Sequence, residues 1–171
     1  ELQEIDLTLM RDKEQLQNLP EIAELARRRK LYIKLKGDAT KYFAQRKDVE
    51  IDLQELDSRE QALHDGIEKA RREVDMDDYR QVQQLEITLS DFAKKLDRVE
   101  FERTEAHQKL STIQADEATL KQNLKKIEDA IVALTKQART HAVDIQSAID
   151  KNERKRTQLF ESLDPALGKA Y

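Results

Sequence analysis

The chain has 171 residues, of which 39% are charged and 38% are hydrophobic, and its formal net charge is −4. Compact domains usually hold about 25% charged and about 45–50% apolar residues, so this chain lacks the apolar side chains for a globular core of the usual size. With only three Gly and two Pro, it has few turn-forming residues, which excludes sheet sandwiches, barrels and Rossmann sheets and leaves long helices. No apolar stretch approaches the length of a membrane-spanning helix.

The first segment predicts a short helix that ends near Pro20. Its apolar residues recur at helical spacing, at Leu2, Ile5, Leu9, Leu16 and Leu19. Proline is tolerated in the first turn of a helix but not in its interior. We therefore expect Asn18 or Leu19 to end this helix, or to kink it, before a longer arm begins. Ile22 and Leu25 then restart the stripe in a shifted phase.

Two longer segments carry alternating three- and four-residue steps between apolar positions. The first runs through Tyr32, Leu35, Ala39, Tyr42, Arg46, Val49, Leu53, Leu56, Glu60, Leu63, Ile67, Ala70 and Val74. The second starts at Val82 and continues in the same steps to His141, Ile145, Ala148 and Asn152. A repeat of 3.5 residues held this long predicts coiled-coil seams.

Between the two seams the phase breaks, and Asp77 or Asp78 can cap a helix that starts near Tyr79. A short connection makes consecutive helices antiparallel neighbours. The sequence therefore predicts an all-α fold, a long antiparallel coiled-coil hairpin of two main helices with a break or kink near Pro20. The predicted hairpin spans 1–163, with an ascending arm at 1–74, a tip at 75–78, a descending arm at 79–163 and an exit segment at 164–171.

A fold centred near residue 76 predicts which residues face each other. Leu63 is expected opposite Phe92, Leu53 opposite Arg103, and Tyr32 opposite Leu124. Six polar residues occupy seam positions, namely Arg46, Glu60, Arg103, Glu117, His141 and Asn152. Buried polar residues in coiled coils commonly fix register, and we favour that interpretation over a binding notch. For His141 this register offers no opposing His or carboxylate, so we expect no metal site there.

One cluster of cations differs from the rest of the chain. Six lie within ten residues with no acid among them, and the predicted register adds three from the descending arm. The candidate contacts for phosphate or an acidic partner, here called the basic collar, are Arg27, Arg28, Arg29, Lys30, Lys34, Lys36, Lys121, Lys125 and Lys126. The tip is acidic instead, and its candidate contacts are Asp75, Asp77, Asp78 and Tyr79.

The sequence shows no phosphate-binding glycine loop, no His-Glu-x-x-His and no Gly-x-Ser-x-Gly. A pair of helices also offers no water-excluding pocket, so we predict that the chain is not an enzyme. The chain contains no Cys and starts without Met or a signal-like stretch, which favours the cytoplasm and a piece of a longer protein.

Three places in the sequence resemble the coiled-coil region of the bacterial C4-type zinc-ribbon family, whose members are described as nucleic-acid-binding proteins. The start at 2–7 followed by Leu16-Gln17-Asn18-Leu19-Pro20 is similar to the family's Leu-Gln-x-Leu-Asp opening and its Leu-Pro step. The segment Asp78-Tyr79-Arg80-Gln81-Val82 resembles the start of the family's returning helix. The end, Leu163-Asp164-Pro165-Ala166-Leu167 with Tyr171, resembles its exit from the coil.

The resemblance implies a four-cysteine zinc ribbon beyond Tyr171, so zinc is expected in that missing domain and no cofactor in this piece. It also implies an adaptor or chaperone-like role in transcription or in secretion and flagellar export. We therefore expect a noncatalytic scaffold with protein partners and no membrane. Two alternatives remain open at this point: a nucleic-acid-binding protein that uses the collar, and a structural spacer arm of a larger ATPase. An apolar stripe at Leu31, Ile33 and Phe43 also hints at pairing between two hairpins.

Overall fold

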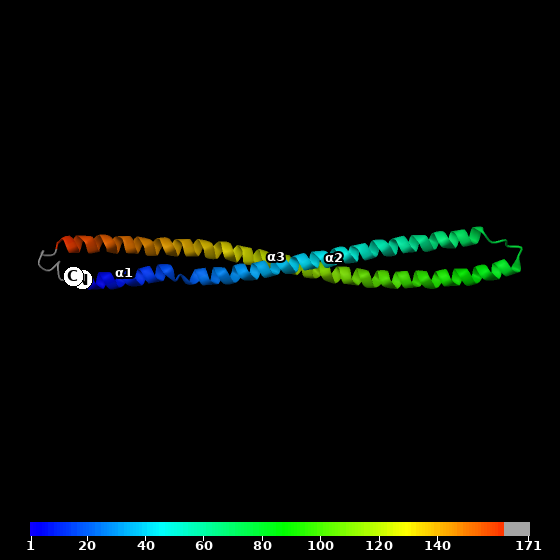
Figure 1. The fold of residues 1–171 in the computed structure, drawn as a ribbon, viewed down its shortest axis with the longest axis horizontal. Coiled ribbons are helices and arrows are strands. Elements are labelled where there is room, and N and C mark those ends of the chain that lie inside the picture. Colours follow the sequence, from blue (N-terminus) through cyan, green and yellow to red (C-terminus); the bar gives the residue numbers. More distant parts are fainter. Residues whose placement is uncertain (163–171) are drawn as a thin grey trace. The chain divides into compact units, whose positions relative to one another are not determined.

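The computed structural model describes residues 1–162, which form an all-α helical hairpin (Figure 1). The elements are α1 (Leu2–Gln17), α2 (Pro20–Arg72) and α3 (Tyr79–Glu161). The predicted fold class is confirmed. No described helix is both long enough and apolar enough to cross a membrane. The predicted exit segment at 164–171, and with it the end of the family resemblance, lies outside the described residues.

The break between α1 and α2 falls where the proline predicts it. Asn18 caps the C-terminus of α1, and its backbone N–H donates to the carbonyl oxygens of Glu14 and Gln15. Pro20 is the first residue of α2, where its missing N–H costs no helical hydrogen bond. The prediction that Asn18 or Leu19 ends the first helix is therefore confirmed.

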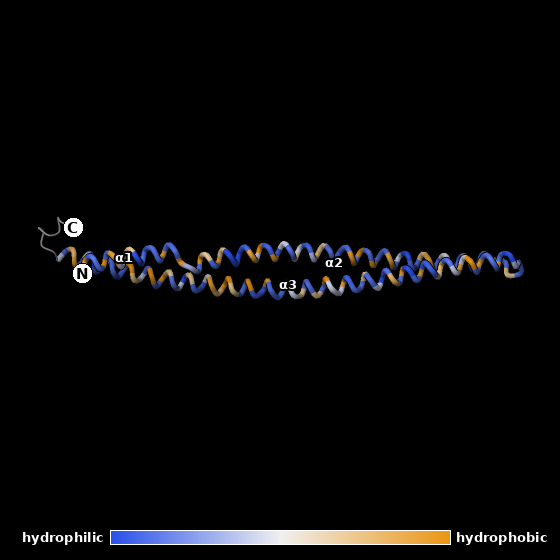
Figure 2. The backbone as a smooth tube through the Cα atoms, turned by 90° about the horizontal axis from the view of Figure 1, so that it is seen from below, coloured by the Kyte–Doolittle hydropathy of each residue, from blue (hydrophilic) through white to orange (hydrophobic). Residues whose placement is uncertain are grey.

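Apolar residues recur at regular intervals along the long helices, with polar stretches between them (Figure 2). The chain divides into two compact units, each of which contains segments of α2 and α3. The first unit consists of Glu1–Leu35 together with the residues from Asn123 onward, and the second is Lys36–Gln122.

In the first unit the core lies between α1 and the last third of α3. Leu9 and Leu19 pack with Ile145 and Ile149, which are all buried. The prediction that Ala148 lies in the seam is wrong, because Ala148 is exposed while Ile149 is 3% exposed. Ile22 is also exposed rather than buried. Two nonhelical residues separate α1 from α2 and shift α1 relative to α2. The α3 residues that pack against α1 therefore do not continue the heptad positions that α3 uses against α2.

In the second unit the buried apolar residues are Val49 and Leu56 of α2 and Val99 and Leu120 of α3. Val99 is the most deeply buried at 1% exposed. Gly66 allows close approach at the tip end, since a Cβ there would lie 2.8 Å from the Phe92 ring. The heptad pattern thus selected the correct faces of both helices here.

The predicted lengthwise register is wrong by about one helical turn. Phe92 packs against Gly66 rather than Leu63, and Arg103 contacts Asp57 and Glu60 rather than Leu53. In the first unit, Tyr32 donates a hydrogen bond to Glu128 rather than facing Leu124.

The path of the tip explains the register offset. α2 ends at Arg72, two residues before the predicted end of the ascending arm. The connection then runs outward past the end of α2 before α3 begins (Figure 1). The first turns of α3 therefore extend beyond α2, and every pairing in this unit is displaced.

Candidate functional site

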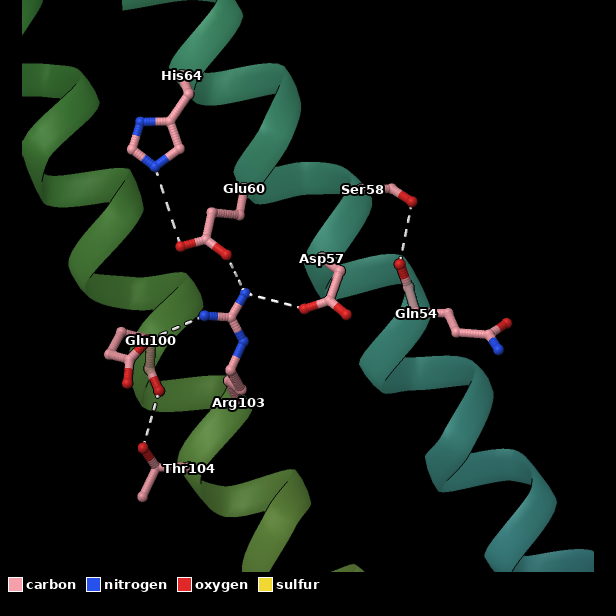
Figure 3. A network of polar contacts seen from close by, with 8 residues as sticks. All are labelled: Gln54, Asp57, Ser58, Glu60, His64, Glu100, Arg103 and Thr104. Carbon is pink, nitrogen blue, oxygen red and sulfur yellow. Dashed lines mark hydrogen bonds and ion pairs between the residues drawn. The ribbon is translucent and has the colours of Figure 1, made fainter.

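Arg103 of α3 is the centre of a polar network in the seam of the second unit (Figure 3). Its Nη2 lies 3.0 Å from Oδ1 of Asp57 and donates a short hydrogen bond to Glu60, while Nη1 lies 3.1 Å from Oε2 of Glu100. The hydrogen bond from Arg103 lowers the pKa of Glu60, and the same bond raises the pKa of Arg103. Both groups therefore stay charged at neutral pH.

A second network lies two heptads along each helix. Nε of Arg46 on α2 lies 3.0 Å from Oε2 of Glu117 on α3, and its Nη1 lies 2.7 Å from Oε1 of Glu50. Hydrogen bonds from Lys47 and Arg46 lower the pKa of Glu50. The polar seam residues Arg46, Glu60, Arg103 and Glu117 thus pair with one another, as a role in fixing register requires.

His141 differs from its sequence interpretation in two ways. It is exposed rather than in the seam, and its Nδ1 lies 3.1 Å from Oε1 of Glu21. The prediction that no carboxylate faces His141 is wrong, because it rested on the displaced register. A backbone hydrogen bond and then the contact with His141 lower the pKa of Glu21, against the effect of burial. Among residues 1–162, no group of three His, Asp or Glu side chains is arranged to hold a metal ion.

In the structure, the collar cations of α3 are displaced along the helix axis relative to the collar cations of α2 that they were predicted to face. Because Tyr32 bonds to Glu128, Lys34 and Lys126 lie at the same depth of the first unit. The run Arg27–Lys30 then faces the uncharged segment Ala130–Ala133 of α3, not Lys125 as the predicted register required. Lys36 and Lys121 belong to the second unit and lie at its end. Within the first unit, the collar is thus less dense than predicted.

Within the first unit, Glu24 neutralises part of the collar, with its carboxylate 3.2 Å from Arg27 and 2.9 Å from Arg28. Five collar cations of the first unit make no ion pair with any of residues 1–162: Arg29, Lys30, Lys34, Lys125 and Lys126. All five are exposed. They come from two helices and form the part of the collar that is free to meet an anionic partner.

At the tip, two of the predicted contacts have structural tasks. Asp78 Oδ1 accepts the backbone N–H of Arg80 at 2.9 Å and caps α3, as the sequence predicts. Asp75 Oδ1 accepts the backbone N–H of Asp77 at 3.0 Å. Tyr79 is 78% exposed, and Met76, which sequence reasoning did not select, is 70% exposed. The exposed residues of the tip therefore include Met76 and Tyr79 as well as Asp77.

Two features escaped the sequence reasoning although the sequence contains a signal for each: the pairing of the polar seam residues and a set of exposed apolar side chains. On the ascending arm, a basic and an acidic seam residue, Arg46 and Glu60, are two heptads apart. The descending arm has the same separation between Arg103 and Glu117. Matching them would have given the observed register. The second set is the exposed apolar side chains on the outer face of α3, Ile87 and Phe101, which repeat at the same heptad position.

Comparison of the chain with family models, with curated proteins and with solved structures gave no match.

Proposed function

We propose that this chain is a noncatalytic interaction scaffold, the coiled-coil arm of a zinc-ribbon protein, whose basic collar binds an acidic surface of a protein partner. The observation that carries this proposal is the group of exposed collar cations without an ion partner among residues 1–162, contributed by α2 and α3 of one unit. Exposed cations of one sign raise the encounter rate with an anionic partner and favour its correct orientation.

An acidic protein surface fits the collar better than a nucleic acid does. Single-stranded nucleic acids are usually held by aromatic side chains on which bases stack. The one aromatic residue within the α2 part of the collar is Tyr32, and its hydroxyl is bonded to Glu128. Nucleic-acid binding by the collar therefore stands as the alternative, supported by charge alone. The spacer arm of a larger ATPase is the second alternative, in which the collar has no partner.

The zinc ribbon, the cytoplasmic location and a role in transcription or export come from the sequence resemblance and from the absence of Cys, and they remain part of the proposal. The ribbon has a direct test, which is the zinc content of the natural full-length protein. About one zinc per chain, released by a thiol-modifying reagent, is expected for a four-cysteine site. A metal-free protein would contradict the family assignment without affecting the collar.

The collar is tested by replacing Arg29, Lys30, Lys34, Lys125 and Lys126 together with Gln, which also favours helix. Binding to polyglutamate and to a DNA duplex is measured by fluorescence anisotropy between about 50 and 200 mM salt, where counterion release is resolved. We expect the parent chain to bind polyglutamate and the variant to bind it at least tenfold more weakly.

A charge-matched control replaces five exposed α3 cations that lie outside the collar: Lys136, Arg139, Lys151, Arg154 and Lys155. This control changes the net charge equally, so it should retain polyglutamate binding if the collar is the site. Equal loss in both variants would reduce the effect to net charge and contradict the proposal. Tighter binding to DNA, with the loss confined to the collar variant, would favour the nucleic-acid alternative.

A further inference from the structure

A groove follows one side of the seam in the second unit, and the function proposed above does not use it. Its lining residues all belong to that unit, and they lie between Val49 and Arg59 on α2 and between Glu102 and Thr112 on α3. The groove has a volume of about 630 Å³, which is within the usual range of about 300–1,000 Å³ for ligand sites. From Val49 to Arg59 is ten residues, or about 15 Å of helix. The groove is therefore about as long as three helical turns.

A small seam residue makes the groove deeper at its middle. Ala106 is partly exposed and lines the groove together with Val49 and Leu56, which are each 6% exposed. It is the smallest member of its row in the α3 seam, where every seventh residue is apolar: Leu85, Phe92, Val99, Ala106, Ile113 and Leu120. The floor of the groove is thus apolar, with a hollow at Ala106 that an added apolar side chain fills.

The ion pair that crosses the groove at one end is not repeated at its middle. At the end, Nη1 of Arg59 on α2 lies 2.9 Å from Oε2 of Glu102 on α3. Seven residues away on each helix are Asp52 and Lys109, which also have opposite charges and also line the groove. Within residues 1–162 neither of these two side chains forms an ion pair. The floor is therefore left open where a second bridge would cover it.

The walls of the groove carry an excess of negative charge. Three lining carboxylates, Asp52, Glu55 and Glu105, are exposed and form no ion pair with any of residues 1–162. Against them stands one lining cation, Lys109, that is likewise unpaired within the described part of the chain. The ion pair at the end of the groove neutralises itself. A cationic partner is therefore attracted to this groove and an anionic one is repelled.

We propose that this groove binds a basic amphipathic helix of a protein partner, which lies along the seam as a third helix. Such helices place apolar anchors at positions i, i+3 or i+4, and i+7 into an apolar groove. The central anchor occupies the hollow at Ala106. Basic residues beside the anchors then face Asp52 and Glu55 on one wall and Glu105 on the other.

The shape of the groove favours a helix over a small molecule. Sites for small molecules bury most of the ligand surface, whereas seven of the lining residues here are exposed and the groove is open to solvent. Both walls are continuous helix over the whole length of the groove. A helix of about three turns matches that length and covers the apolar floor while its polar face stays in water.

The proposal is tested with labelled peptides and the full 171-residue chain. The probe is a fluorescein-labelled peptide of about 20 residues, long enough for some helix in isolation, with Leu at positions i, i+3 and i+7 and with Lys and Ala elsewhere. One control peptide has Glu in place of Lys, and another keeps the Lys residues but has Pro at its centre, which breaks the helix. Fluorescence anisotropy should show binding of the Lys peptide and at least tenfold weaker binding of both controls.

Filling the hollow tests the position of the central anchor. Ala106→Leu should weaken binding of the Lys peptide at least tenfold, while the thermal unfolding midpoint of the chain stays the same or rises because the seam gains apolar contacts. Ala118→Leu, at an exposed α3 alanine outside the groove, is the size-matched control and should bind the peptide as the parent does.

Neutralising the walls tests the charge complementarity without changing the floor. The variant with Asp52→Asn, Glu55→Gln and Glu105→Gln should also bind the Lys peptide at least tenfold more weakly. Its charge-matched control neutralises three exposed acids of the same unit that do not line the groove, Asp48→Asn, Glu86→Gln and Asp97→Asn. This control should keep most of the affinity. Circular dichroism checks that each variant has the helical content of the parent.

Four results would overturn the proposal. The first is a Lys peptide that does not bind, and the second is an equal loss of binding in the groove variant and its charge-matched control, which would reduce the effect to net charge. The third is equally tight binding of the Pro peptide, which would mean that the ligand is not a helix. The fourth is a dimer of the chain alone in analytical ultracentrifugation that Ala106→Leu abolishes, which would give the groove to a second copy. The collar is tested separately, because its polyglutamate binding involves none of these residues.

Discussion

Arg46 on α2 forms an ion pair with Glu117 on α3. Two heptads further along, Glu60 and Arg103 form another, in which α2 supplies the acid and α3 the base. Sliding one helix by a single heptad would place Arg46 against Leu110 or Leu124, which offer no acceptor. The two pairs therefore discriminate the observed register from neighbouring ones. Their contribution lies in specificity, because partly exposed ion pairs add little to stability.

Reversing one member of a pair should destabilise the second unit. Arg46→Glu brings a third carboxylate beside Glu50 and Glu117, so we expect the thermal unfolding midpoint to fall by several degrees. Arg46→Glu combined with Glu117→Arg should recover much of the loss. Circular dichroism measures the midpoints. Lys109→Glu, an exposed α3 position, is the charge-matched control and should change the midpoint less; an equal effect would show that only net charge matters.

Acid should weaken the same unit. Contacts with Arg103 lower the pKa of Glu60, and contacts with Arg98 and Arg59 lower that of Glu102, both from an ordinary value of 4.5. A carboxyl whose folded pKa is depressed stabilises the fold above its unfolded pKa and loses that effect as pH falls through the folded pKa. We therefore expect the unfolding midpoint to be flat from pH 7 to about pH 5 and to drop below about pH 4.5.

The variant Glu60→Gln separates this effect from general acid unfolding. It removes one depressed carboxyl, so its midpoint should be lower at pH 7 but should fall less between pH 5 and pH 3. A parallel decline in the parent and in the variant would show that Glu60 is not responsible.

The two glycines inside α2 should respond differently to Ala. A Cβ on Gly37 would meet nothing within 4 Å, whereas a Cβ on Gly66 would lie 2.8 and 3.0 Å from two atoms of the Phe92 ring. Glycine in a helix interior costs about 0.8–1 kcal/mol relative to Ala. Gly37→Ala should therefore stabilise the chain by about 1 kcal/mol in urea unfolding. Gly66→Ala must displace the ring and should gain less or destabilise; equal gains would mean that Phe92 moves freely.

Burial, not hydrophobicity alone, should decide the cost of a core change. Leu56 is 6% exposed and Ile51, five residues earlier on α2, is 52% exposed. Truncating a buried Leu typically costs about 2–5 kcal/mol, and we expect Leu56→Ala to lie near the lower value because the seam of two helices is thin. Ile51→Ala should cost less than about 0.5 kcal/mol. Comparable losses would contradict the seam assignment.

The repeat of apolar residues predicted the helices, the break before Pro20 and the cap at Asp78, because these depend on local sequence. It could not predict the register. Periodicity tells which face of a helix is buried, whereas the lengthwise offset depends on the path of residues 73–78 and on which charges meet. The collar shows the consequence: the predicted positions of Lys125 and Lys126 relative to the cations on α2 were displaced by the same turn.

The separation of α1 from α2 makes the N-terminal helix a dependent element. At 16 residues α1 is near the length below which isolated helices are marginal in water. Its persistence rests on Leu9 packing with Ile145 and Ile149. Residues 2–17 should therefore open more often than the neighbouring helices, with faster amide exchange and earlier cleavage by a protease. Their release would uncover Ile145 and Ile149 on α3, so a competing helix could take the place of α1 without unfolding the rest of the chain.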